Sequence, residues 1–172
     1  TSFCEALSCY PEGIDGRVGI VSLSGGHGVV AADTCAANSI LLPEAGEKTI
    51  ANIREKLSSE IKHIASLTNP MDLTGSAVDD DFIAAASGLS SDPEIDCVLL
   101  LLLPYSPGVS SDLGARLSQV YQKEGKPLVA YVPHEARYRM LIEGFELNNV
   151  PVSPSIEGAV FMVEAMRRCQ PC

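Results

Sequence analysis

The chain has 172 residues, which is enough for one domain with a buried core. Apolar residues make up 46% and charged residues 20% of it, as in an ordinary globular protein. Its formal net charge of −10 disfavours nucleic acids and anionic membranes as partners, because both carry negative charge. No basic start followed by a long apolar run indicates a signal peptide, and the longest apolar run, Val98 to Leu103, is too short to cross a bilayer. We therefore expect a cytoplasmic protein.

The first part of the chain predicts a strand followed by a glycine-rich turn and a helix. Residues 1–16 are expected to form a lead-in helix and a loop. Residues 17–23 (RVGIVSL) form a short run rich in valine and isoleucine, which is typical of a buried strand. Residues 24–28 (SGGHG) indicate a tight turn, and residues 29–38 an alanine-rich helix that packs closely on a sheet.

The middle of the chain continues this alternation. Residues 40–42 predict a second short strand that Pro43 ends, and residues 47–57 an amphipathic helix. Residues 58–67 show no clear pattern. Residues 69–75 (NPMDLTG) have the composition of a loop, and residues 79–89 predict a helix with acidic residues in its first turn.

The last part predicts three strands, each followed by a loop or a helix. Ser110 or Ser111 is expected to cap the helix that runs to about residue 124, and Ser155 the helix that ends near Arg168. The other expected elements are strands at 96–103, 127–132 and 150–152, a loop at 104–108 and a helix at 135–148.

Strands that alternate with helices predict an α/β domain with three layers, in which helices cover both faces of a doubly wound parallel sheet. About five strands are typical of a flavodoxin-like domain. We assign residues 17–168 to this domain and residues 169–172 to a tail.

Ligands of open parallel sheets bind at the carboxyl ends of the strands, and three predicted segments gather there. Glycines and a helix N-terminus in the first segment favour an anion, although the pattern from Gly26 to Ala31 is only a loose dinucleotide fingerprint. The side chains of the other two segments bond phosphate or simply stabilise loops and cap helices. The candidate residues are Ser24, Gly25, Gly26, His27, Gly28, Asn69, Asp72, Thr74, Gly75, Ser106 and Ser110.

The remaining histidines and cysteines carry weaker signals. His27 lies at a helix N-terminus, where an attached phosphate would be stabilised, but no partner carboxylate is identifiable. His63 and His134 read as a helix-surface and a helix-start residue. Cys169 and Cys172 form a lone CxxC pair without a second pair at zinc-ligand spacing, so we expect neither a metal nor a redox site.

Three of these segments resemble one domain of the NDP-forming (ADP-forming) acyl-CoA synthetases. Residues 18–34 are similar to its strand–turn–helix, with His27 in place of the usual proline. Residues 69–75 are similar to its Asn-Pro-Val-Asp-Leu-Thr-Gly loop, and residues 150–160 to its closing strand and helix. The resemblance extends, more distantly, to the C-terminal domain of the succinyl-CoA synthetase β subunit.

The resemblance implies a single domain of a larger ligase that converts acyl-CoA, ADP and phosphate to acid, CoA and ATP. In that family CoA binds on one domain and a histidine on a second domain is phosphorylated by an ATP-grasp module, and a domain of this kind docks against the phosphohistidine domain. The Ser-His-Thr-Gly phosphohistidine motif is absent here, so no catalytic residue and no cofactor are expected in this domain. The parent enzyme would use ATP or ADP, Mg²⁺ and CoA, and could assemble as an oligomer.

Two other functions stay open on the residues alone. A stand-alone domain that binds a nucleotide or flavin would use the same glycine-rich turn, but aromatic residues make up only 5% of the chain. A receiver-like regulatory domain needs acidic residues where the first strand ends, and Ser22 and Ser24 stand there instead.

Overall fold

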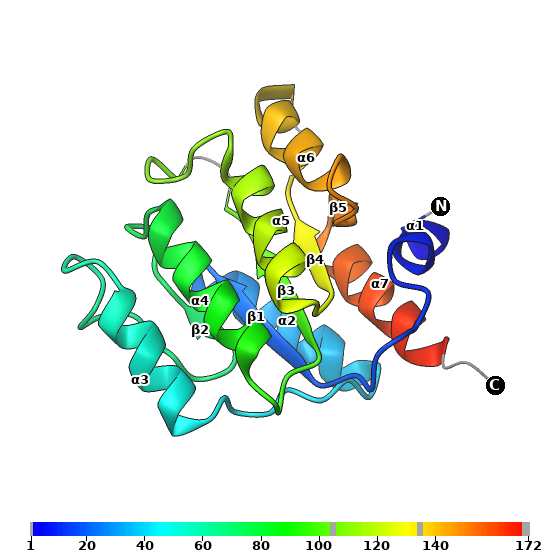
Figure 1. The fold of residues 1–172 in the computed structure, drawn as a ribbon, viewed down its shortest axis with the longest axis horizontal. Helices are drawn as coiled ribbons and strands as arrows, with labels where there is room; N and C mark the ends of the chain where they lie inside the picture. The colour runs from blue at the N-terminus through cyan, green and yellow to red at the C-terminus, as the bar shows by residue number, and fades with distance from the viewer. Residues whose placement is uncertain (1, 104–105, 134–135, 170–172) are drawn as a thin grey trace.

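The computed structural model describes residues 2–103, 106–133 and 136–169 and has a five-stranded parallel sheet at its centre (Figure 1). The strand order is β2-β1-β3-β4-β5, the order of a flavodoxin-like doubly wound sheet, which confirms the predicted class. The strands are β1 (Val18–Ser22), β2 (Met71–Asp72), β3 (Cys97–Leu101), β4 (Leu128–Tyr131) and β5 (Val152–Ser153).

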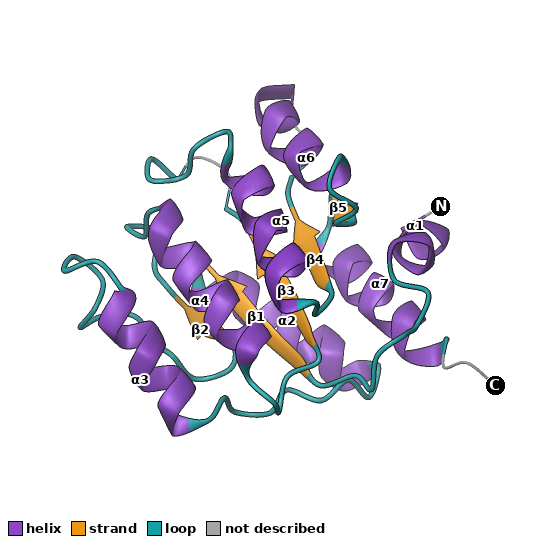
Figure 2. Ribbon diagram, in the orientation of Figure 1, coloured by secondary structure: helices purple, strands orange, loops and turns teal. Residues whose placement is uncertain are grey.

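Helices cover both faces of the sheet (Figure 2). Successive residues of β3 belong to different cores, because Leu99 packs in the core on one face of the sheet and Leu100 in the core on the opposite face. No helix in the described part of the chain is long and apolar enough to span a membrane. The first layer contains α1 (Ser2–Cys9), α2 (Gly25–Ala37) and α7 (Ile156–Arg168); the second contains α3 (Glu47–Lys56), α4 (Asp79–Ser91), α5 (Leu113–Glu124) and α6 (Arg139–Glu146), which follows the 3₁₀ turn η1 (Ala136–Tyr138).

The edge strand beside β1 is not the one predicted. Residues 40–42 meet β1 only at its start, where Leu41 bridges to Arg17, because Pro43 has no N–H to continue the ladder. Met71 and Asp72 take over at the other end of β1, opposite Val21 and Ser22. The expectation of a plain loop at 69–75 was therefore wrong: its Asn, Pro and Gly content concealed a short buried strand.

Two helix starts also differ from the predictions. Helix α2 begins at Gly25 and not after Gly28, because a bend at Ser22–Ser24 turns the chain before the glycines. The first residue of α5 is Leu113, preceded by Asp112, so neither Ser110 nor Ser111 caps that helix. The prediction for α7 is confirmed, since Ser155 Oγ accepts the backbone N–H of Gly158 at 3.0 Å.

The lead-in segment is bound to the sheet through Tyr10. Helix α1 packs against α7, and the Tyr10 side chain is almost fully buried beyond its end. Its hydroxyl donates to the Leu128 carbonyl at 3.0 Å and accepts the Leu128 N–H at 3.3 Å. These bonds satisfy the N–H and carbonyl groups of Leu128, the first residue of β4. The adjacent strand β5 pairs with β4 only at Ala130 and Tyr131.

Candidate functional site

The chain leaves β1 through a closed bend at the carboxyl edge of the sheet. The Ser22 hydroxyl donates to the Ser24 carbonyl at 2.8 Å and accepts the Ser24 N–H at 3.0 Å. The same pair of bonds joins Ser153 and Ser155 at the end of β5, at 2.8 and 3.3 Å. Because α2 and α7 pack side by side, the two bends start two neighbouring helices on the same face of the sheet.

The N-terminus of α2 has neither a side-chain cap nor an acidic residue in its own first turn. The first turns of α3, α4 and α7, in contrast, each contain at least one acidic residue. The backbone N–H groups of Gly25, Gly26 and His27 have no acceptor among the described residues. The first N–H groups of a helix and its dipole favour an anion, so this end is chemically suited to bind phosphate.

The loop around β2 packs directly against this helix end. A Cβ atom on Gly25 would lie 3.1 Å from Asp72 Oδ2, and one on Gly28 3.2 Å from the Cβ of Pro70. Both glycines therefore allow an approach that a larger residue would hinder. The other carboxylate oxygen of Asp72 accepts the Thr74 N–H at 2.9 Å, which holds Thr74 at a left-handed φ of 67°.

A cavity of about 430 Å³ lies between α2 and β2. Four predicted candidates line it together, namely Ser24, Gly25, Gly28 and Asp72. The other lining residues are Ser22, Val29, Ala32, Asp33, Ser66, Pro70 and Met71. The structure thus brings the first and second predicted segments to one place, at the positive end of α2.

Asn69 has a structural position rather than a place in this cavity. Its Oδ1 accepts the Ile20 N–H at 3.0 Å, and its Nδ2 donates to the carbonyls of Val18 and Pro43, both at 2.8 Å. The side chain therefore fills the gap in the edge strand between Leu41 and Met71. This polar residue belongs to the sheet, and the loop reading of its segment missed that role.

His27 is not among the residues that line the cavity, and its ring lies against the end of β4. Its ring meets the ring of Tyr131 edge to face, with centroids 5.6 Å apart. The Nδ1 atom is buried and has no hydrogen-bond partner among the described residues. Tyr131 ends β4, so His27 spans from the β1–α2 junction to the carboxyl end of a more distant strand.

The third predicted segment lies on the other face and forms a separate cluster. Ser106 Oγ donates to the Gly75 carbonyl at 3.3 Å, which joins it to the loop of Thr74. The Ser110 hydroxyl is bound to the carboxylates of Asp79 and Asp112, and the Ser110 N–H donates to Asp79 at 3.0 Å. Both polar groups of Ser110 are thus occupied by carboxylates of the same cluster.

Of the residues named from the sequence, His134 and Cys172 lie outside the described residues, as do the first two residues of the expected loop at 104–108. Within the described ranges no cluster of three or more His, Cys, Asp or Glu side chains could hold a metal ion.

The sequence analysis did not identify Ser22, which forms the bend after β1, or Asp79, which binds Ser110. The repeated Ser-x-Ser at Ser22–Ser24 and Ser153–Ser155 was a usable signal for the two bends.

No protein-family model matches this chain. The ADP-forming acetate–CoA ligase II subunit alpha of Pyrococcus furiosus is 31% identical over 144 residues, which cover 78% of this chain and 30% of that protein. The ADP-forming 4-hydroxybutyrate–CoA ligase of Nitrosopumilus maritimus is 25% identical over 170 residues, which cover 96% of this chain and 23% of the relative. The chain thus spans less than a third of each.

Solved structures show the same fold. The dinucleotide-forming acetyl-coenzyme A synthetase 1 of Ca. Korarchaeum cryptofilum superimposes with a TM-score of 0.84 at 23% identity. The match covers 98% of this chain and 37% of that one. The same synthetase has been solved in complex with phosphate and ADP, with the same TM-score.

Proposed function

This chain is homologous to part of the ADP-forming acyl-CoA ligases, and we propose that it serves as a docking domain in such an enzyme. In this role the N-terminus of α2 is presented to a phosphorylated histidine on another domain and stabilises its phosphate. Residues 17–168 form the domain, and the nucleotide, Mg²⁺ and CoA are bound by other parts of the enzyme. The phosphohistidine domain and an ATP-grasp domain are its partners.

The observation that carries the proposal is the row of unbonded backbone N–H groups at the N-terminus of α2. Three backbone N–H groups there lack acceptors in the described structure, and Gly25 and Gly26 are exposed. Two apolar side chains follow them on the surface, Val29 at 60% and Val30 at 40% exposed. An anion-binding end with exposed apolar residues beside it suits a surface that closes over a charged group of another domain.

Asp72 gives this end a second function in the proposal. When the lone-pair nitrogen of a histidine attacks phosphorus, the other ring nitrogen keeps its N–H and the ring becomes an imidazolium, which a carboxylate acceptor stabilises. Asp72 Oδ2 lies beside Gly25, while Oδ1 is occupied by the Thr74 N–H. The helix end would thus bind the phosphate while Asp72 accepts the imidazole N–H.

A charge placed at Gly26 tests this role in the full-length enzyme. A Cβ at Gly26 meets only Ser24 Oγ, at 3.7 Å, so a side chain fits without strain. Gly26→Asp adds a negative charge that helix dipoles favour, and the fold should keep or gain stability. The same charge repels phosphate, so we expect phosphoenzyme formation from labelled ATP to fall at least about tenfold.

Gly26→Ala is the matched control and should retain nearly wild-type phosphoenzyme levels, because it adds no charge. Phosphoenzyme levels of Gly26→Asp equal to those of the control would overturn the proposed role of α2. The chain by itself, supplied with acyl-CoA, ADP and phosphate, should make no ATP. Turnover by the chain alone would contradict its assignment as a docking domain.

A further inference from the structure

A second cavity lies far from the proposed docking edge, where β1, β3 and β4 begin. It has a volume of about 670 Å³. The lead-in segment, the α4–β3 turn and the α5–β4 turn form its walls, which include Tyr10, Arg17, Asp96 and Lys126. Its volume lies within the range of small-molecule sites, which typically hold a few converging polar groups.

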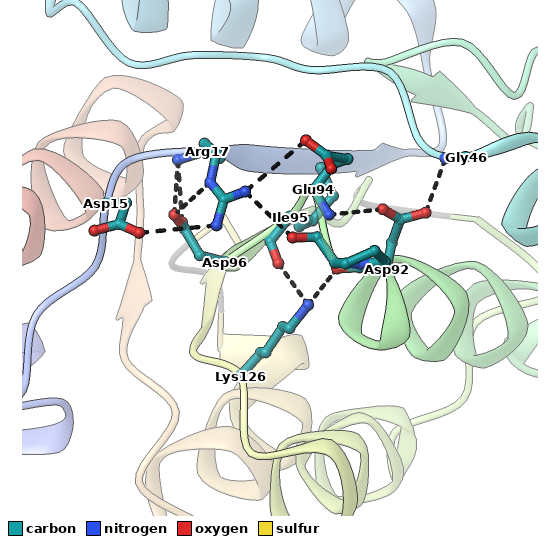
Figure 3. A network of polar contacts seen from close by, with 9 residues as sticks. Asp15, Arg17, Gly46, Asp92, Glu94, Ile95, Asp96 and Lys126 are labelled. Carbon is teal, nitrogen blue, oxygen red and sulfur yellow. Dashed lines mark hydrogen bonds and ion pairs between the residues drawn. The ribbon is translucent and has the colours of Figure 1, made fainter.

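The two cations in this cavity have different surroundings (Figure 3). Arg17 forms ion pairs with three carboxylates, those of Asp15, Glu94 and Asp96. Lys126 forms no ion pair with any described carboxylate, although its side chain is half-buried. Its Nζ donates instead to two backbone carbonyls of the α4–β3 turn, those of Asp92 and Ile95.

This arrangement accommodates a neutral amine. A neutral lysine has two N–H donors and one lone pair, and the carbonyls of Asp92 and Ile95 take both donors. The lone pair then points away from the turn. Burial lowers the pKa of Lys126 and the charge of Arg17 adds to this, while the charges of Asp92, Asp96 and Glu124 oppose it. The net direction is downward, which increases the fraction of the nucleophilic form.

We propose that Lys126 is a modification site, at which a small activated acyl group that enters the cavity is transferred to Nζ. The acyl donor is an acyl phosphate or an acyl thioester. The lone pair of Nζ bonds to the carbonyl carbon, and the bond from this carbon to phosphate oxygen or thiol sulfur breaks. The leaving group departs with the electron pair, and the proton from nitrogen passes to water. The inference does not require the proposed docking function.

Acylation also changes the turn that Lys126 holds. The product amide keeps only one N–H, so one of the two carbonyls, of Asp92 or Ile95, loses its donor. The α4–β3 turn positions Asp96, which binds both the backbone and the side chain of Arg17. The modified protein should therefore have a lower melting temperature than the unmodified one.

The test compares lysines within one protein by peptide mass spectrometry. The purified protein is treated briefly with acetyl phosphate or acetyl-CoA at about pH 7.5. Lys123 is the internal control, because it lies on the same segment, is 77% exposed and pairs with Glu124. We expect Lys126 to be acetylated at least about threefold faster than Lys123, despite its lower exposure.

Two further conditions show whether the fold causes this preference. In a urea-unfolded sample the two lysines should react equally, and near pH 11 the exposed Lys123 should react at least as fast, because both amines are then neutral. Reaction with acetyl phosphate alone would identify a small donor, and reaction with both reagents would show that the cavity admits a thioester of CoA. A folded protein in which Lys126 reacts no faster than Lys123 with either donor would overturn the proposal.

Discussion

The side-chain oxygen of Asn69 accepts the backbone N–H of Ile20 at 3.0 Å, as a strand residue beside β1 would. Its amide nitrogen binds the carbonyls of Val18 and Pro43, so one side chain joins the two halves of an interrupted edge strand. Buried backbone groups that lose a partner cost free energy, which makes this residue a structural requirement of the sheet.

Replacing this side chain should destabilise the domain. We expect Asn69→Ala to lower the free energy of unfolding by about 2–3 kcal/mol, because partly buried groups of Val18 and Ile20 lose their partner. Denaturant unfolding measures the change. Asn38→Ala is the control, since Asn38 donates only one side-chain bond, to Thr34, and it should cost clearly less. Equal losses in both variants would contradict the bridging role.

The hydroxyl of Tyr10 should stabilise the start of β4. Tyr10→Phe keeps the ring but leaves the N–H and carbonyl of Leu128 without their partner, so we expect a loss of about 1–2 kcal/mol. Tyr121→Phe is the matched control, because the ring centroids of Tyr121 and Tyr10 lie only 5.1 Å apart. Thermal unfolding should show a drop for the first variant and little change for the second.

Close packing between α5 and α6 depends on Gly114. A Cβ atom at this position would lie 2.2 Å from the Leu141 carbonyl oxygen, and backbone cannot move as easily as a flexible side chain. We expect Gly114→Ala to destabilise the domain by about 2–3 kcal/mol, although alanine favours helices. Gly26→Ala, at an open helical position, should be neutral. An unchanged unfolding midpoint for Gly114→Ala would refute this packing.

Stability should fall in acid through Asp92. Burial opposes its ionisation, but hydrogen bonds from Thr49, Glu94 and Gly46 and the charge of Lys126 outweigh burial and lower its pKa below 3.8. A carboxyl with a lowered folded pKa stabilises the fold above about pH 3.8, and this contribution is lost as the pH falls through the folded value. Unfolding free energies of wild type and Asp92→Asn should therefore converge in acid. A difference in unfolding free energy between the two proteins that stays constant from about pH 6 to about pH 2.5 would contradict this role of Asp92.

The sequence determined the alternation of elements and the buried strands. The apolar runs at 17–23 and 96–103 became β1 and β3, whose residues are all buried, because a strand covered by helices on both faces needs apolar residues throughout. Helix patterns at 47–57 and 79–89 were also right, since the apolar face of α4 meets the sheet and that of α3 meets α4.

Tertiary contacts decided what local composition could not. Met71 and Asp72 form a strand because Asn69 and the end of β1 supply partners that no local pattern shows. The helix start at Gly25 likewise depends on the Ser22–Ser24 bend, and Ser110 binds Asp79 from a distant helix. Periodicity reports which faces are buried, whereas the partner of a polar side chain depends on residues far along the chain. Only the folded structure therefore brought Asp72 to the N-terminus of α2 and Lys126 to the α4–β3 turn.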